Sequence, residues 1–258
     1  MRLLFFLAVL PSILLAYRVL SYDRIEREPA GLLIKLFVLG ALSCLPAGII
    51  EGLGMGPINA IADSEIWVSR LTFLLLVPLA EEGCKYLALR TSRKSKEFNY
   101  TFDGIVYGTM VSLGFATLEN VLYVLDAMTI EVAVMRGILS VPLHCTCGIF
   151  MGYYYGVARG LEVRRNVDEM RYAKFLMIFV PCLVHGIYDY SLDTDSSLVF
   201  FAGILFTVLI FVTASRQVRI ASANDAPIMV SLSKLAAPIP ASMPSKGHTP
   251  PPPFSKLQ

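Results

Sequence analysis

Charged side chains are scarce in this sequence. Only 16% of its 258 residues are Asp, Glu, Lys or Arg, whereas a soluble domain carries about 25%. Hydrophobic residues make up 55%, and several apolar runs reach the roughly 20 residues that a helix needs to cross a bilayer. The composition therefore excludes an ordinary soluble protein. It predicts an all-α, polytopic transmembrane helix bundle whose main partner is the lipid bilayer, and it gives no reason to expect a nucleic-acid partner.

Cysteine is also sparse, and its placement excludes a disulfide framework. The five cysteines are an odd number, and all lie in apolar runs, at Cys44, Cys84, Cys145, Cys147 and Cys182. Structural disulfides need thiols that meet in an oxidising compartment. We expect all five to be small buried hydrophobic side chains.

Hydropathy predicts seven membrane spans. Their approximate ranges are 2–21, 31–53, 67–89, 103–126, 132–158, 171–191 and 197–215. Lys and Arg concentrate in alternate loops, for example after the third and fifth spans, which places the N-terminus outside and the C-terminus in the cytoplasm. Most of the positive charge near the first span follows its apolar core, so that span is interpreted as a retained helix rather than a signal peptide.

Two segments outside the spans are predicted to be irregular. Residues 51–65 contain several glycines and Pro57 and are interpreted as an external loop. Residues 221–258 hold eight of the fifteen prolines. The chain is therefore divided into a helix bundle at 1–215, with a catalytic core at about 67–191, and a disordered, proline-rich cytoplasmic tail at 216–258.

The third span contains three charged side chains in an otherwise apolar run, at Glu81, Glu82 and Lys85. One charge at the bilayer centre costs roughly 2.5–3.5 kcal/mol or more, so these groups must face a protein interior or a water-filled cavity. Lys85 follows the two acids by four and three residues and can reach either of them on one helical face. A buried salt bridge that only fixes helix packing is the alternative to a functional site.

Three later spans add further polar side chains. They are Glu119 and Asn120 in the fourth span, His144 in the fifth, and His185 with Asp189 in the sixth. The sequence has three histidines, and the third, His248, lies in the tail. Because Asp189 follows His185 by four residues, its carboxylate can hold one imidazole nitrogen. Histidine with an oriented carboxylate is typical of a general base or of a metal ligand.

The fourth span also carries a stripe of small residues. Gly104, Gly108, Ser112 and Ala116 recur every four residues, and such a stripe lets another helix approach closely. We therefore expect this span to be packed tightly against a neighbour.

Together these motifs resemble one known family. The sequence has Glu-Glu-x-x-Lys at 81–85, Gly-Phe-Ala-x-x-Glu-Asn at 114–120, Pro-Leu-His at 142–144 and His-Gly-x-x-Asp at 185–189. They are similar, in this order, to the motifs of the PrsW family of bacterial intramembrane proteases, which is related to CAAX prenyl proteases and bacteriocin-processing enzymes. The resemblance covers about residues 67–191. It implies a multi-pass protein of the prokaryotic plasma membrane that hydrolyses a membrane-anchored protein, as family members do in the first cut of an anti-sigma factor.

By the same resemblance, the predicted catalytic residues are Glu81, Glu82, Lys85, Glu119, Asn120, His144, His185 and Asp189. Glu82 is preferred as the general base, and Lys85 either keeps Glu81 ionised or donates to a carbonyl group. Asn120 is the expected donor to the developing oxyanion.

The cofactor is left open. The sequence lacks His-Glu-x-x-His, the usual two-histidine zinc motif. His144 and His185 with one carboxylate could still hold Zn²⁺ and leave one position open. In the alternative, the site is metal-free and the same histidines orient a water.

Two other functions are weighed. A proton-coupled membrane transporter would also use buried Glu and His relays, but the expected internal repeat is not evident. A scaffold that recruits partners through its proline-rich tail would leave the buried charges unexplained.

Overall fold

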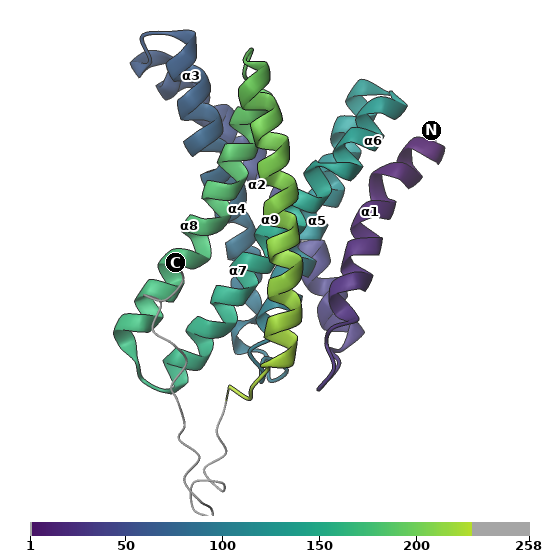
Figure 1. Cartoon of the computed structure of the whole chain (residues 1–258), viewed down its shortest axis with the longest axis vertical. Coiled ribbons are helices and arrows are strands. Elements are labelled where there is room, and N and C mark those ends of the chain that lie inside the picture. The colour runs from purple at the N-terminus through teal and green to yellow at the C-terminus, as the bar shows by residue number, and fades with distance from the viewer. Residues whose placement is uncertain (1, 229–258) are drawn as a thin grey trace, which may run out of the picture.

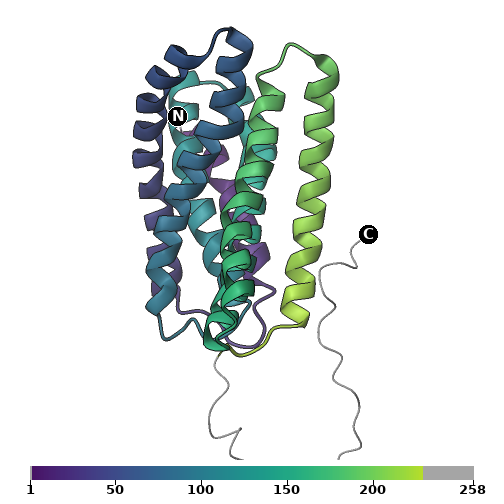
Figure 2. The ribbon, with the colours of Figure 1, turned by 90° about the vertical axis from the view of Figure 1, so that its left-hand side faces the viewer.

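The computed structural model describes residues 2–228, and over this range the chain is helical with no regular strand. The elements are α1 (Arg2–Leu20), α2 (Ala30–Ile61), α3 (Glu65–Leu71), the π-helical turn η1 (Thr72–Leu76), α4 (Val77–Leu89), the 3₁₀ turn η2 (Arg90–Lys94), α5 (Asp103–Ala127), α6 (Ile130–Ile138), α7 (Ser140–Val163), α8 (Val167–Leu192) and α9 (Ser197–Ala223). Figures 1 and 2 show the long helices running side by side along one axis. The first helix begins at the upper end of Figure 1 and α9 ends at the lower one.

The all-α, polytopic fold predicted from hydropathy is confirmed. Within the described residues, six helical segments are long and apolar enough to cross a membrane. The segment predicted as the third span is helical throughout, but it is divided into α3, η1 and α4, each shorter than a full crossing. The predicted fifth span consists of α6 and α7, which meet at a break at Leu139.

The external loop predicted at 51–65 is wrong. Helix α2 continues through Pro57 to Ile61, so that only residues 62–64 separate it from α3. Glycine and proline indicate loops in soluble proteins. In membrane helices they are tolerated, because neighbouring helices and local adjustments satisfy the freed backbone groups.

The predicted boundary between bundle and tail also lies too early. Helix α9 extends to Ala223, and the following residues return to the bundle. The amide of Thr101 donates to the carbonyl of Ala226 at 3.0 Å, and the amide of Ile228 donates to the carbonyl of Asn99 at 2.7 Å. Residues 216–228 are therefore part of the bundle, whereas the rest of the predicted tail, 229–258, lies outside the described residues.

Helix α5 forms the centre of the bundle, where its small residues allow close packing. A methyl group added to Gly104 or Gly108 would overlap the backbone of Gly152 or Gly148 in α7. On another face, a methyl group at Gly114 would overlap the carbonyl oxygen of Phe37 in α2. The close approach predicted from the small-residue stripe is thus confirmed, and it holds α5 and α7 at backbone contact.

Helices α4 and α8 come together where α4 begins. The π turn η1 precedes Pro78, and Gly186 of α8 packs there: a methyl group at Gly186 would lie 3.1 Å from the carbonyl oxygen of Phe73 and 3.1 Å from Pro78 Cγ. π turns are frequent at functional sites. Here the turn and the small residue at 186 allow His185 to approach the acidic pair of α4.

All five cysteines are free thiols, and four of them are buried, as predicted. Cys44 is only partly buried and lies at the edge of the cavity described next.

Candidate active site

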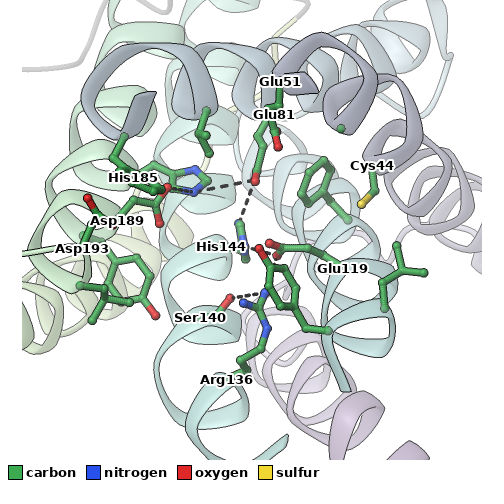
Figure 3. Close-up of a pocket in the computed structure, with 18 of the residues that line it drawn as sticks. Cys44, Glu51, Glu81, Glu119, Arg136, Ser140, His144, His185, Asp189 and Asp193 are labelled. Atoms are coloured by element: carbon green, nitrogen blue, oxygen red, sulfur yellow. Dashed lines mark hydrogen bonds and ion pairs between the residues drawn. The ribbon is translucent and has the colours of Figure 1, made fainter. Parts of the chain in front are cut away.

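A cavity of about 510 Å³ opens among α2, η1, α4, α5, α6, α7 and α8. The acidic, basic and histidine side chains of its lining are Glu51, Glu81, Glu119, Arg136, His144, His185, Asp189 and Asp193. Asp193 follows the end of α8 on the side that loop charges assign to the exterior. Figure 3 shows side chains from separate helices converging on this space.

Lys85 is the centre of the polar cluster behind the cavity. Its ammonium nitrogen Nζ lies 2.7 Å from Glu82 Oε1 and 3.1 Å from Glu81 Oε2, so both predicted contacts are confirmed. It also lies 2.8 Å from His144 Nδ1 and 4.1 Å from the centre of the Phe115 ring. The side chain is fully buried, so its charge is balanced by these neighbours rather than by water.

The contact with Lys85 determines how His144 is protonated. A lysine ammonium can only donate hydrogen bonds, so His144 Nδ1 must be the acceptor. The proton of the neutral ring is then on Nε2, which lies 2.8 Å from Glu119 Oε2. Glu119 therefore orients His144 from the far side.

His185 is held between carboxylates from its own helix and from α4. Its Nε2 lies 3.2 Å from Asp189 Oδ2, as the spacing predicted, and its Nδ1 lies 2.8 Å from Glu82 Oε1. The imidazoles of His144 and His185 meet edge to face, with ring centres 5.1 Å apart. Four helices, α4, α5, α7 and α8, thus contribute to one cluster of buried acids and histidines.

The two adjacent acids occupy different positions. Glu81 lines the cavity and is 5% exposed, whereas Glu82 is 0% exposed and is not part of the lining. Figure 3 shows the Glu81 carboxylate between the two imidazoles, with its Oε2 3.9 Å from His144 Nδ1 and 3.8 Å from His185 Nε2. The sequence-based preference for Glu82 as the group that meets water is therefore not supported, because Glu81 is the acid that faces the cavity.

Asn120 is directed away from the cavity. Its side-chain amide donates to the backbone carbonyl of Ala8 in α1 at 2.8 Å, and its carbonyl oxygen accepts from Arg136 Nε at 3.2 Å. Both ends of the amide are thus occupied. The geometry gives Asn120 a role in fixing α1 and Arg136, and it does not support the predicted role as oxyanion donor.

Sequence reasoning missed Arg136, which lies near the start of the predicted fifth span. This side chain lies in α6 and is the one Lys or Arg on the lining of the cavity. Its Nη2 lies 2.9 Å from Glu119 Oε2, and its guanidinium carbon lies 3.8 Å from the centre of the Tyr123 ring. No sequence motif identifies it, because α6 had been treated as the start of one continuous span.

Glu51 was missed for a related reason. It lines the cavity from α2, but the sequence placed it where a loop was expected to begin. Its place on the cavity becomes apparent only because α2 continues for ten more residues, to Ile61.

The cluster suits a metal ion in its donor types. Glu81, Glu82, His144 and His185 each offer a ligand atom, and these atoms lie within 4.8 Å of one another. Imidazole nitrogens and carboxylate oxygens are usual zinc ligands. Both Nε2 atoms have outer carboxylates, a pattern common around metal-binding histidines. In addition, Glu82 Oε2 is buried without a hydrogen-bond partner among the described residues. A bound metal ion would compete with the Lys85 ammonium for ligand atoms of Glu81, Glu82 and His144.

A membrane helix bundle that gathers carboxylates and imidazoles around an accessible cavity has the groups that an intramembrane hydrolase needs. A family model described as PrsW family intramembrane metalloprotease matches residues 28–214. The chain therefore belongs to the PrsW family. It is an intramembrane protease and a multi-pass bacterial membrane protein that acts on a membrane-protein substrate within the bilayer. The transporter alternative is not retained.

Curated relatives agree with this assignment over most of their length. The chain is 34% identical over 194 residues to a protein named Protease PrsW from Clostridioides difficile, which covers 73% of this chain and 79% of the relative. It is 34% identical over 189 residues to Protease PrsW of Bacillus subtilis, covering 73% and 81%. For the protein of the same name from Geobacillus kaustophilus the identity is 33% over 208 residues, covering 80% and 86%. A comparison with solved structures gave no significant match.

Proposed function

We propose that Glu81 is the general base of peptide-bond hydrolysis. The observation that carries this proposal is the position of its carboxylate, which faces the cavity while Lys85 and the two imidazoles surround it. Glu81 takes a proton from a water molecule as the water oxygen attacks the substrate carbonyl carbon. When the C–N bond breaks, Glu81 returns that proton to the leaving amine.

The remaining residues of the cluster orient these groups. Lys85 fixes one oxygen of Glu81, and Glu82 holds both Lys85 and His185 from the buried side. Glu119 and Asp189 orient His144 and His185, and the two imidazoles flank the Glu81 carboxylate. These roles keep seven of the eight predicted residues in the catalytic machinery, with Asn120 moved to a supporting position.

Arg136 is the proposed group that stabilises the developing oxyanion. It is a positively charged side chain on the cavity wall, and preorganised donors of this kind stabilise charge that forms in the transition state. Arg136→Gln should lower kcat by about 100-fold, and Arg136→Lys should restore part of it. Unchanged kcat in Arg136→Gln would limit the side chain to its structural contacts with Glu119, Asn120 and Tyr123.

Zn²⁺ is the proposed metal, with His144, His185 and Glu82 as ligands, which leaves Glu81 as the base. When bound, a metal of this kind makes water a stronger nucleophile and polarises the scissile carbonyl. The support for this proposal is the set of donor types and their proximity, together with the family's description as metalloproteases.

The proposed substrate is a membrane-anchored anti-sigma factor, cut first by this protein in a regulated cascade. Support comes from membership of the PrsW family and from the site's location within the membrane bundle. We further propose an external N-terminus and a cytoplasmic C-terminus, because Lys and Arg concentrate in alternate loops.

The decisive experiment is cleavage of a membrane-anchored reporter by purified protein in liposomes. Parent, Glu81→Gln and Glu131→Gln are compared, since Glu131 is an exposed acid of α6 that gives the same change in charge. Loss of cleavage in Glu81→Gln alone supports the assignment. Parental cleavage by a folded Glu81→Gln protein would exclude Glu81 as the base.

A further inference from the structure

A second cavity, of about 260 Å³, lies at the opposite end of α4 from η1 and is strongly basic. Four of its lining residues are cationic, Arg90, Arg93, Arg159 and Lys174, and one is anionic, Glu162. Glu162 pairs with Arg93 and with Arg159. The lining therefore carries three more positive than negative charges. Loop charges assign this end of the bundle to the cytoplasm.

Several donors in this basic cavity have no protein partner. Among the described residues, no ion pair is formed by Arg90 or Lys174. The Nε of Arg159 is buried and has no hydrogen-bond acceptor among residues 2–228. A buried guanidinium N–H without an acceptor costs free energy. An anion in the cavity would supply the missing acceptor.

An apolar groove adjoins the basic cavity. It has a volume of about 680 Å³ and is lined by apolar side chains of α2, η1, α4 and α8, with Leu79, Leu87 and Ile178 among them. Tyr86 lines both the groove and the basic cavity. The two spaces therefore both border Tyr86, with apolar side chains on one side and positive charge on the other.

We propose that this composite site binds an anionic phospholipid. The phosphate headgroup occupies the basic cavity and accepts from Arg159, Arg90 and Lys174, while an acyl chain lies in the apolar groove along α4. Basic pockets between membrane helices on the cytoplasmic side are suited to anionic headgroups. The bound lipid would clamp α4, the helix that carries Glu81, Glu82 and Lys85, against α7 and α8.

The first test measures lipid-dependent stability of the purified full chain in detergent. Dioleoyl phosphatidylglycerol should raise the Tm of the parent, and dioleoyl phosphatidylcholine should not. The double variant Arg90→Gln/Lys174→Gln should bind phosphatidylglycerol about 30-fold more weakly, from two lost charges near a membrane surface. The matched control is Arg164→Gln/Arg171→Gln, which removes two exposed charges outside the basic cavity and should behave as the parent does.

A second variant tests the groove separately. A Cβ atom added at Gly83 meets no atom within 4 Å, and Gly83 lines the groove, so Gly83→Leu places a side chain in the groove. It should reduce the number of phosphatidylglycerol molecules retained in native mass spectrometry. If both double variants weakened phosphatidylglycerol binding equally, the basic cavity would not be the binding site. The lipid would then be held by diffuse electrostatic attraction to the protein surface. Equal stabilisation of the parent by glycerol phosphate, or unchanged lipid retention in Gly83→Leu, would overturn the assignment of a lipid.

Discussion

The two adjacent acids of α4 offer the sharpest test of the mechanism, because the same chemical change is expected to act differently at each. Glutamine at position 81 keeps the size of the side chain and can still accept from Lys85, but it cannot take a proton. General base catalysis typically contributes 10²–10⁴-fold, so Glu81→Gln should lower kcat by about that factor. The protein should remain folded and inserted.

Glutamine at position 82 should instead weaken the fold. Glu82 is fully buried, and one of its oxygens lies 2.7 Å from Lys85 Nζ and 2.8 Å from His185 Nδ1. Removing one partner from a buried charged cluster costs about 3–5 kcal/mol. Glu81 makes one hydrogen bond, to Lys85 at 3.1 Å, and because glutamine can still accept it, Glu81→Gln should cost less than the roughly 1.5–3 kcal/mol of a charged hydrogen bond. The fall in Tm should therefore be larger for Glu82→Gln.

The assay combines reporter cleavage in liposomes with thermal unfolding in detergent for both variants. Cleavage activity per folded molecule separates a loss of catalysis from a loss of stability, because folded Glu82→Gln still has Glu81 as its general base. The reasoning would be refuted if folded Glu82→Gln were inactive while Glu81→Gln still cleaved the reporter. That result would make Glu82 the general base and would leave Glu81 with only its ion pair to Lys85.

Three further outcomes are expected. Elemental analysis should find about one zinc ion per parent chain and a sharp loss in both His144→Ala and His185→Ala; an active parent that lacks metal and resists chelators would exclude the metal. A chain ending at Ile220 should unfold at a lower temperature than one ending at Ile228, because it lacks the contacts of residues 225–228 with Asn99, Thr101 and Phe102; equal Tm values would show that these contacts add nothing. Burial raises the pKa of Glu28 to about 7 and that of Asp23 to about 6, in the loop before α2. Because these pKa values exceed the unfolded ones, the folded state binds protons more tightly, and Tm should fall as pH rises from about 4 to 7. Glu28→Gln, which keeps an acceptor for the Tyr107 hydroxyl, should flatten that dependence, and an unchanged slope would contradict it.

Local spacing was enough to identify much of the active site. On a helix, residues three and four apart are neighbours, so the contacts of Lys85 with Glu81 and Glu82, and of His185 with Asp189, follow from the sequence. The cost of charge in an apolar span likewise predicts that such groups gather around a protected interior. Hydropathy likewise predicted the polytopic helical fold. A segment that crosses the bilayer must pair its own backbone N–H and C=O groups, and a helix does so.

Tertiary packing decided which of these groups face the cavity. Successive residues of an α-helix are turned by about 100°, so Glu81 and Glu82 cannot both point the same way. The rotation of α4 is set by its contacts with η1 and Gly186, which no local pattern encodes. The same holds for Asn120, whose amide is occupied by α1, and for Arg136, which reaches the cavity because the chain breaks at Leu139. Sequence spacing fixes neighbours within one helix, whereas the partners contributed by another helix depend on how the helices are rotated and packed.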